Sequence, residues 1–168
     1  MTDDASRPWP AEIVERYERP LLAYAGRMLG GDWQGAQDAV QETFLRLCRA
    51  DREQIESRVA AWLFSVCRSR VIDMQRTKRA TPIDSAAATV PDRSPPASQT
   101  LSDEEEKRHL SELIVGLSPR QQEVLRLRMQ AGLSYREIAD VTGMSVSNVG
   151  FHLHEAIRNL RKTLTSSP

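Results

Sequence analysis

The sequence has few aromatic residues, no long apolar run and no excess charge of either sign, and these shortages exclude several classes of protein. Only 5% of its 168 residues are aromatic, and it is rich in Leu, Ala, Arg and Glu, which favours helices over strands. No apolar stretch reaches the roughly 20 residues that a membrane-spanning helix needs. The acidic residues 1–4 do not resemble the start of a signal peptide. We therefore expect an all-α protein that works in the cytoplasm, with no membrane insertion.

Cysteine is also scarce, and its spacing favours no metal site. Cys48 and Cys67 lie far apart without a CxxC pair, so reduced thiols in packing roles are favoured over a disulfide or a zinc site. A redox-sensing pair stays open as an alternative, although no motif supports it. His152 and His154 are two residues apart on an expected helix and face different directions, which argues against a metal there.

Motifs for catalysis are missing as well. The chain has no phosphate-binding glycine loop, no HExxH and no GxSxG. We therefore expect no catalytic residues, no cofactor, no metal and no enzymatic activity.

The balance of charge restricts how this chain could bind nucleic acid. It has 23 basic and 23 acidic residues and a pI near 6.8. A protein that binds DNA unaided is usually basic, because neutralising phosphates supplies most of the non-specific affinity. Either the chain does not bind DNA, or a partner supplies much of the affinity.

The most patterned part of the sequence is residues 117–162, which predict three short helices at helix-turn-helix spacing. Two of these helices open with a capping box, Ser118 with Gln121 and Ser134 with Glu137. Gly143 is expected to end the middle helix in a left-handed conformation, and Ser145 to cap the next. A helix held after a tight turn is a device for entering the DNA major groove. A helical bundle without a DNA role is the alternative.

Spacing separates the last helix into two faces. Its apolar stripe, expected to pack on the two preceding helices, holds Val149, Leu153, Ile157, Leu160 and Leu164. The residues left on its outer surface are Ser147, Asn148, Phe151, His152, Glu155 and Arg158.

Composition divides the chain into two small helical domains. Residues 81–100 hold four prolines among Ser, Thr, Ala and Asp, a composition typical of a flexible linker. We expect helical domains at 1–80 and 102–168, joined by a linker at 81–101. Ser102 is expected to cap the first helix of the second domain. Fully extended, such a linker spans up to roughly 70 Å, so two modules on one chain could contact two separate DNA elements.

Residues 1–80 are expected to form helices with one apolar stripe each. The first stripe runs from Ile13 to Leu29, with an optional bend at Pro20, and Gly30 and Gly31 end it. Asp32 is expected to cap the second helix. The inner face of that helix holds Ala36, Val40, Phe44 and Leu47, and its outer face holds Asp38, Gln41, Glu42 and Arg46.

The end of this domain is the only strongly basic segment of the chain. An apolar stripe, expected in the core, consists of Val59, Trp62, Leu63, Val66 and Ile72. The same expected helix carries Arg68, Arg70, Arg76, Lys78 and Arg79 against a single acid, Asp73. A solvated helix end is one interpretation and a nucleic-acid surface is the other. The polar residues 48–57 that precede the stripe are expected to form a loop.

Three motifs, in order, resemble conserved regions of bacterial RNA polymerase sigma factors of the sigma-70 family. DAVQETFLR at 38–46 resembles the region-2 helix that docks on the polymerase clamp, and AWLFSVCRSRVID at 61–73 resembles the following helix, which handles the −10 promoter element. LSPRQQEVL at 117–125 and LSYREIA at 133–139 resemble region 4, which reads the −35 element. Two domains without a middle one resemble the layout of the extracytoplasmic-function (ECF) group. The resemblance covers nearly the whole chain.

The resemblance implies a role for three sets of residues. Core polymerase is expected to contact Asp38, Gln41, Glu42 and Arg46. The −10 DNA is expected to contact Arg68, Ser69, Arg70, Asp73 and Arg76, with residues 48–57 holding an extruded base. The −35 DNA is expected to contact Ser147, Asn148, Phe151, His152, Glu155 and Arg158.

The expected partners are core RNA polymerase, through its clamp and flap, promoter DNA and an anti-sigma factor. Polymerase would supply the affinity that a neutral chain lacks. The sequence departs from the family at Ser69, where relatives often have Asn, and at Gly150, His152 and Glu155, where many have Lys or Arg. Asn148 suits adenine and Glu155 suits the amino group of cytosine.

Two rival functions stay open from the sequence. One is a sigma-fold mimic that binds an anti-sigma protein without promoter DNA, which the weakly basic last helix would allow. The other is a helix-turn-helix regulator that binds an operator as a dimer, which would leave the first 80 residues unexplained.

Overall fold

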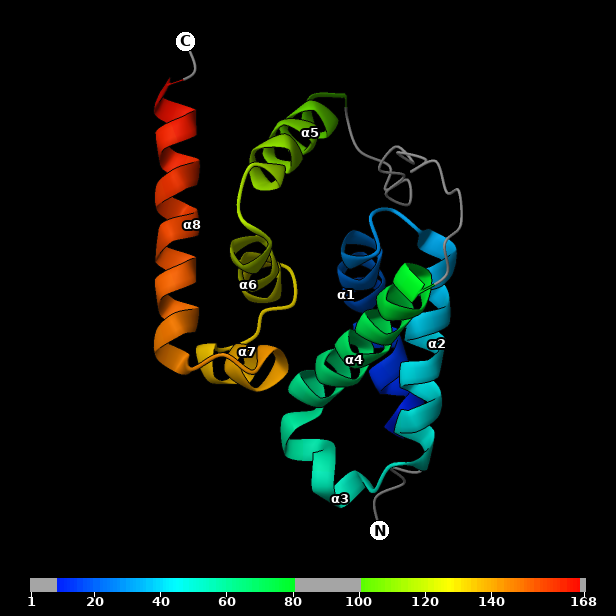
Figure 1. Ribbon diagram of the computed structural model, residues 1–168. Helices are drawn as coiled ribbons and strands as arrows, with labels where there is room; N and C mark the ends of the chain where they lie inside the picture. The colour runs from blue at the N-terminus through cyan, green and yellow to red at the C-terminus, as the bar shows by residue number, and fades with distance from the viewer. Residues whose placement is uncertain (1–8, 81–100, 167–168) are drawn as a thin grey trace. The chain divides into compact units, whose positions relative to one another are not determined.

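The computed structural model describes residues 9–80 and 101–166, and all regular secondary structure in these ranges is helical (Figure 1). The described residues fall into two compact units, one on each side of residues 81–100. This confirms the predicted all-α fold with two small helical domains. The predicted linker lies almost wholly outside the described residues, so the domain boundaries at 80 and 102 stay a prediction.

Unit 1, the part of the chain before the predicted linker, is built around three long helices. Its elements are α1 (Trp9–Met28), α2 (Trp33–Arg49), α3 (Arg52–Ile55), the 3-10 turn η1 (Glu56–Arg58) and α4 (Val59–Ala80). Helices α1, α2 and α4 pack against one another around a small core (Figure 1). Leu21, Leu63 and Phe64 are fully buried in it, and the ring of Phe64 meets Tyr24 edge-on at 5.4 Å between centroids.

The turn between α1 and α2 follows from local chemistry. Gly30 and Gly31 take φ values of 65° and 92°, a left-handed region that favours glycine. Asp32 then caps α2, and its Oδ1 accepts a hydrogen bond from the Gly35 amide at 2.9 Å. Both predictions are confirmed, and α1 runs through Pro20 without ending there.

The prediction of which α4 side chains are buried is partly wrong. Its buried side chains are Ala61, Leu63, Phe64, Cys67 and Val71, whereas Trp62, Val66 and Ile72 are only half-buried. The first turns of α4 carry apolar residues around most of the helix, so periodicity alone does not select the side that α1 and α2 cover.

A similar shift occurs in α2. Thr43 is fully buried where Phe44 was expected, and Phe44 is half-buried. The Thr43 hydroxyl donates a hydrogen bond to the Ala39 carbonyl at 2.8 Å. Because that bond satisfies the hydroxyl inside its own helix, threonine can occupy the core position without leaving a polar atom unpaired.

Unit 2, the part of the chain after the predicted linker, carries the helix-turn-helix. Its elements are α5 (Leu101–Val115), α6 (Pro119–Met129), α7 (Tyr135–Thr142) and α8 (Val146–Ser166). Both predicted capping boxes are present, at Ser118 and at Ser134. Gly143 ends α7 with a φ of 77°, and Ser145 Oγ accepts from the Asn148 amide at 3.1 Å. Helix α5 begins at Leu101, one residue before the predicted cap Ser102.

The predicted packing of α8 holds only for its first half. Val149, Leu153 and Ala156 are buried, but Ile157 is 41% exposed and Leu164 is 52% exposed. Helices α6 and α7, which pack on α8, are short, and the last turns of α8 extend beyond them (Figure 1). An apolar stripe on a long helix therefore does not guarantee burial along its whole length.

The close contact between α1 and α2 generates a stability prediction. A Cβ added at Gly26 would overlap the ring of Trp33. Alanine normally stabilises a helix interior by up to about 1 kcal/mol relative to glycine. We expect the opposite here: Gly26→Ala should lower the free energy of unfolding by about 1–3 kcal/mol, because the packed ring must move. Urea denaturation of the full chain measures this.

Trp33→Leu supplies the control, because a smaller side chain leaves room for the new methyl group. In that background Gly26→Ala should cost clearly less than it does alone. Equal costs in the two backgrounds would contradict a direct contact.

Candidate functional site

The outer face of α2 places the four predicted polymerase-binding residues together. Asp38, Gln41 and Arg46 are exposed and Glu42 is half-exposed. Glu42 Oε1 lies 3.3 Å from Arg46 Nε, one helical turn away.

Two apolar side chains that the sequence did not assign to a site join this face. Leu45 is 53% exposed, and the neighbouring Phe44 is half-buried. The exposure of Leu45 could have been predicted from the sequence, because this residue lies outside the predicted apolar stripe of the helix. With these two residues the face combines an apolar centre with polar side chains around it, the composition of a protein–protein interface.

Helix α4 separates its predicted −10 residues into two groups. Ser69, Asp73 and Arg76 are exposed, and steps of four and three put them on one stripe of the helix. Arg68 and Arg70 are half-buried and lie off this stripe. Trp62, seven residues before Ser69, continues the stripe toward the N-terminus of α4.

The predicted burial of Trp62 is therefore corrected. It was expected in the core, and the structure leaves it half-buried. Leu63, Cys67 and Val71 occupy the face of α4 that is buried, at steps of four, and Trp62 lies to one side of them.

Lys78, an exposed residue of the basic end of α4, makes a contact within unit 1. Its Nζ lies 2.8 Å from Asp32 Oδ2, while the other oxygen of Asp32 caps α2. Gln75 Nε2 donates to the Met28 carbonyl at 2.7 Å, so two side chains tie the end of α4 to the turn between α1 and α2. The hydrogen bond from Lys78 and the amide of Gly35 lower the pKa of the Asp32 carboxyl below its usual value.

Residues 48–57 are not the open loop that was expected. Cys48 and Arg49 complete α2, and Asp51 caps α3 by accepting a hydrogen bond from the Glu53 amide at 3.1 Å. Ile55 is buried and anchors this helical segment to the core. The prediction of a loop rested on the polar composition of this segment. It missed the capping residue Asp51 and the buried Ile55 four positions later.

Helix α8 presents the predicted −35 residues on and beside one outward face. Ser147, Asn148 and Arg158 are exposed, and Phe151 is 60% exposed. His152 and Glu155 are half-buried at the edge of this face. Glu155 Oε1 lies 3.4 Å from Arg158 Nη1, and the rings of Phe151 and His152 meet edge-on at 5.5 Å. We call these six residues the reading face.

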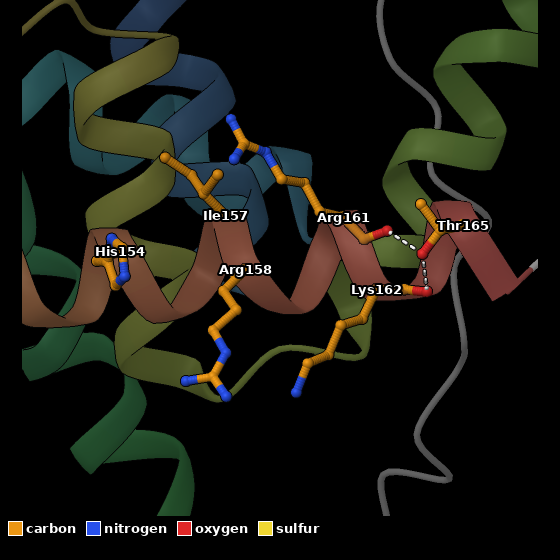
Figure 2. A pocket seen from close by; sticks show the side chains of 6 residues that line it. All are labelled: His154, Ile157, Arg158, Arg161, Lys162 and Thr165. Carbon is orange, nitrogen blue, oxygen red and sulfur yellow. Dashed lines mark hydrogen bonds between the residues drawn. The ribbon is translucent and has the colours of Figure 1, made fainter.

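The second half of α8 bears a shallow hollow (Figure 2). The side chains that line it all come from α8 and are His154, Ile157, Arg158, Arg161, Lys162 and Thr165. The Thr165 hydroxyl donates to the Arg161 and Lys162 carbonyls at 3.0 Å, so it turns toward its own backbone. What remains accessible is a cationic surface with an apolar patch.

The two cysteines differ in environment. Burial raises the pKa of the Cys67 thiol to about 12, and only a hydrogen bond with Thr43 opposes that shift. Cys67 is a packing residue, whereas Cys48 is exposed at the end of α2. Among the described residues there is no group of His, Cys, Asp and Glu that could hold a metal ion. The same ranges contain no helix long and apolar enough to cross a membrane.

Each of the two units matches a known protein family. The family model for Sigma-70 region 2 matches residues 13–81, and the model for Sigma-70, region 4 matches residues 107–160. The chain is 30% identical to the ECF RNA polymerase sigma factor SigL of Mycobacterium tuberculosis, over 90% of this chain and 86% of that protein. It is 27% identical to the RNA polymerase sigma factor YlaC of Bacillus subtilis, over 93% and 92% of the two chains.

Solved structures agree on the fold. CnrH in complex with the cytosolic domain of CnrY matches with a TM-score of 0.62 and 24% identity, over 95% of this chain and 89% of that one. The sigma factor RpoE with the anti-sigma factor NepR from Bartonella quintana matches with a TM-score of 0.59 and 20% identity, over 94% and 99%. The chain belongs to the ECF family of RNA polymerase sigma factors, which are transcription initiation factors.

The two contacts of Asp32 generate a prediction about pH. Asp32→Asn keeps a capping side chain but loses the ion pair, which at a partly exposed site should cost at most about 1 kcal/mol of unfolding free energy. Asp32→Ala also loses the cap and should cost roughly 1 kcal/mol more. Because folding lowers the pKa of Asp32, its charge stabilises the fold above the unfolded value of 3.8, and this contribution disappears as the pH falls through the folded pKa.

Denaturation at neutral and acidic pH measures the effect. The difference between wild type and Asp32→Asn should shrink in acid, and Lys78→Met should add nothing to Asp32→Asn. A difference that stays constant into strong acid would show that the ion pair is not its cause.

Proposed function

We propose that this chain binds core RNA polymerase, recognises the −10 and −35 elements of its promoters and promotes transcription initiation through three separate surfaces. The observation that carries the proposal is that most of the candidate contact residues in the segments matching regions 2 and 4 are exposed on α2, α4 and α8. No covalent step is required of the chain, so we propose recognition and strand separation, not enzymatic catalysis.

The outer face of α2 is our candidate surface for the polymerase clamp. Leu45 and Phe44 supply apolar area, and Asp38, Gln41 and the Glu42–Arg46 pair supply polar contacts. The pair is exposed and contributes little to the stability of the helix, so its side chains can exchange partners when the clamp arrives. Contacts between region 4 and the flap would complete the attachment.

The stripe on α4 is our candidate surface for the −10 element. Arg76 would bind backbone phosphate, and Ser69 and Asp73 offer hydrogen bonds to base edges. Taking a base out of the duplex costs a few kcal/mol. The half-buried ring of Trp62 on the same stripe is suited to stacking on such a base, which is worth about 1–3 kcal/mol. Stacking on Trp62 would thus offset much of that cost.

The reading face of α8 is our candidate surface for the −35 element. Asn148 can pair with adenine and Phe151 can contact a thymine methyl group. Glu155 partly neutralises Arg158, so the face carries little net positive charge. We infer that promoter binding relies on polymerase for orientation and affinity.

An anti-sigma factor is a proposed further partner. Both solved neighbours are complexes with a second protein, the cytosolic domain of CnrY in one and the anti-sigma factor NepR in the other. We place the chain in the cytoplasm, because polymerase and promoter DNA are there.

Reconstituted transcription tests this function. Core polymerase and the purified chain are incubated with a library of promoter-length duplexes, and transcripts are sequenced. We expect initiation from a defined subset that shares two elements. On a selected promoter, Trp62→Ala should reduce open-complex formation by roughly tenfold or more, and Trp62→Phe should retain most activity because the ring remains.

Absence of any promoter-specific transcript would contradict the sigma function. A chain that binds an anti-sigma protein but starts no transcripts would instead be the sigma-fold mimic. Binding to one operator as a dimer without polymerase would indicate an ordinary helix-turn-helix regulator.

The α2 surface has its own test. Leu45→Asp places a charge in the proposed apolar centre and should weaken core binding by at least tenfold in a co-purification or anisotropy assay. Because Leu45 is exposed, the fold should tolerate the change. Arg19→Asp, on an exposed position of α1, is the control and should bind core normally. Equal binding by both variants would place the clamp contact elsewhere.

A further inference from the structure

The segment of residues 51–58, which joins α2 to α4, has little buried surface to hold it in place. It consists of the cap Asp51, the short helix α3 and the turn η1, and Ile55 is its one buried side chain. A helix this short is not stable by itself, because forming a first turn costs more conformational freedom than its hydrogen bonds return. The Asp51 cap accepts from the Glu53 amide inside the segment, so it fixes the local shape but not the position. Contacts with the long helices must therefore set where the segment lies.

Trp9, the first residue of α1, makes such a contact. The guanidinium carbon of Arg52 lies 5.5 Å from the centre of the Trp9 ring, and Arg52 Nη2 lies 2.9 Å from Glu56 Oε1. The start of α1 and α3 lie at the same end of unit 1 (Figure 1). The ring and the carboxylate together restrict a side chain that is flexible in isolation. The stack thus joins the segment 51–58 to α1.

Trp62 brings the proposed place of base stacking beside this segment. Trp62 lies in the first turn of α4, which begins at Val59 directly after η1. A side chain on a helix is directed toward the helix N-terminus and covers the surface over the preceding turn. The indole of Trp62 is therefore directed toward the junction of η1 and α4. A base stacked on it would have the segment 51–58 as its neighbour.

We propose that Trp9 is a positioning residue for −10 strand separation: by holding Arg52, it fixes the segment 51–58 as one wall of the place where an extruded base stacks on Trp62. This inference rests on the proposed −10 role of Trp62. A wall that is ordered before DNA arrives reduces the entropy lost on binding. Trp9 acts through Arg52 and needs no contact with DNA. It precedes residues 13–81, the part of the chain that matches Sigma-70 region 2.

The experiment measures how reconstituted holoenzyme binds a single-stranded oligonucleotide that carries the −10 element of a promoter selected from the duplex library. We expect Trp9→Ala to weaken binding about two- to fivefold, the size of an exposed cation–π contact. Trp9→Phe should retain most of the affinity, because a ring still faces the guanidinium. In an Arg52→Gln background, Trp9→Ala should cost nothing further, because the contact is already lost.

A double-mutant cycle with Trp62 separates positioning from general stability. If Trp9 supports a base on Trp62, Trp9→Ala should cost little affinity once Trp62→Ala has removed the stacking ring. The effects of the two substitutions on the free energy of unfolding, measured in urea, should add, because the proposed coupling exists only when a base is bound. A merely structural role of Trp9 would lower the affinity equally in both backgrounds.

An equal loss from Trp9→Ala in the wild-type and Trp62→Ala backgrounds would overturn the proposal. So would a Trp9→Ala variant that binds the oligonucleotide as tightly as wild type. A Trp62→Ala variant with unchanged affinity would remove the −10 role of Trp62 and this inference with it. If wild-type holoenzyme starts no transcripts, the sigma function itself fails, and that result is distinct from the others.

Discussion

The shared core of α1, α2 and α4 is the constraint on which unit 1 depends. Leu21, Leu47, Leu63 and Phe64 commit one side of each helix to the interior, so only the opposite sides can carry function. Asp32 fixes how these sides are arranged, because one carboxylate caps α2 and also holds Lys78 of α4. The surfaces proposed to bind polymerase and the −10 DNA are thus positioned by the same few contacts, and a change in the core would disturb both.

Sequence reasoning was most reliable where structure is local. The capping boxes at Ser118 and Ser134 and the left-handed Gly143 were predictable, because each involves groups within a few residues. The buried faces were harder to assign. Thr43 is buried where Phe44 was predicted to be, and Trp62 is only half-buried although it was predicted in the core. Which side of a helix is buried depends on the helices that pack against it. The stack of Arg52 on Trp9 joins two helices and has no signature in the sequence.

The neutral charge of the chain has a structural counterpart. Lys78 pairs with Asp32, Arg158 with Glu155, Arg46 with Glu42 and Arg52 with Glu56. Cations with a nearby carboxylate attract DNA less strongly from a distance. In the proposed function this limits stray binding of the free subunit, and polymerase brings the remaining cations to the promoter in a fixed arrangement.

The contrast between the two thiols has a practical consequence. With a pKa of about 12, Cys67 carries almost no thiolate at neutral pH and lies out of reach of reagents. Cys48 is exposed at the end of α2, beside the proposed clamp-binding surface. A maleimide dye should therefore label the native chain at Cys48 alone, giving a fluorescent reporter of docking without engineering a new cysteine.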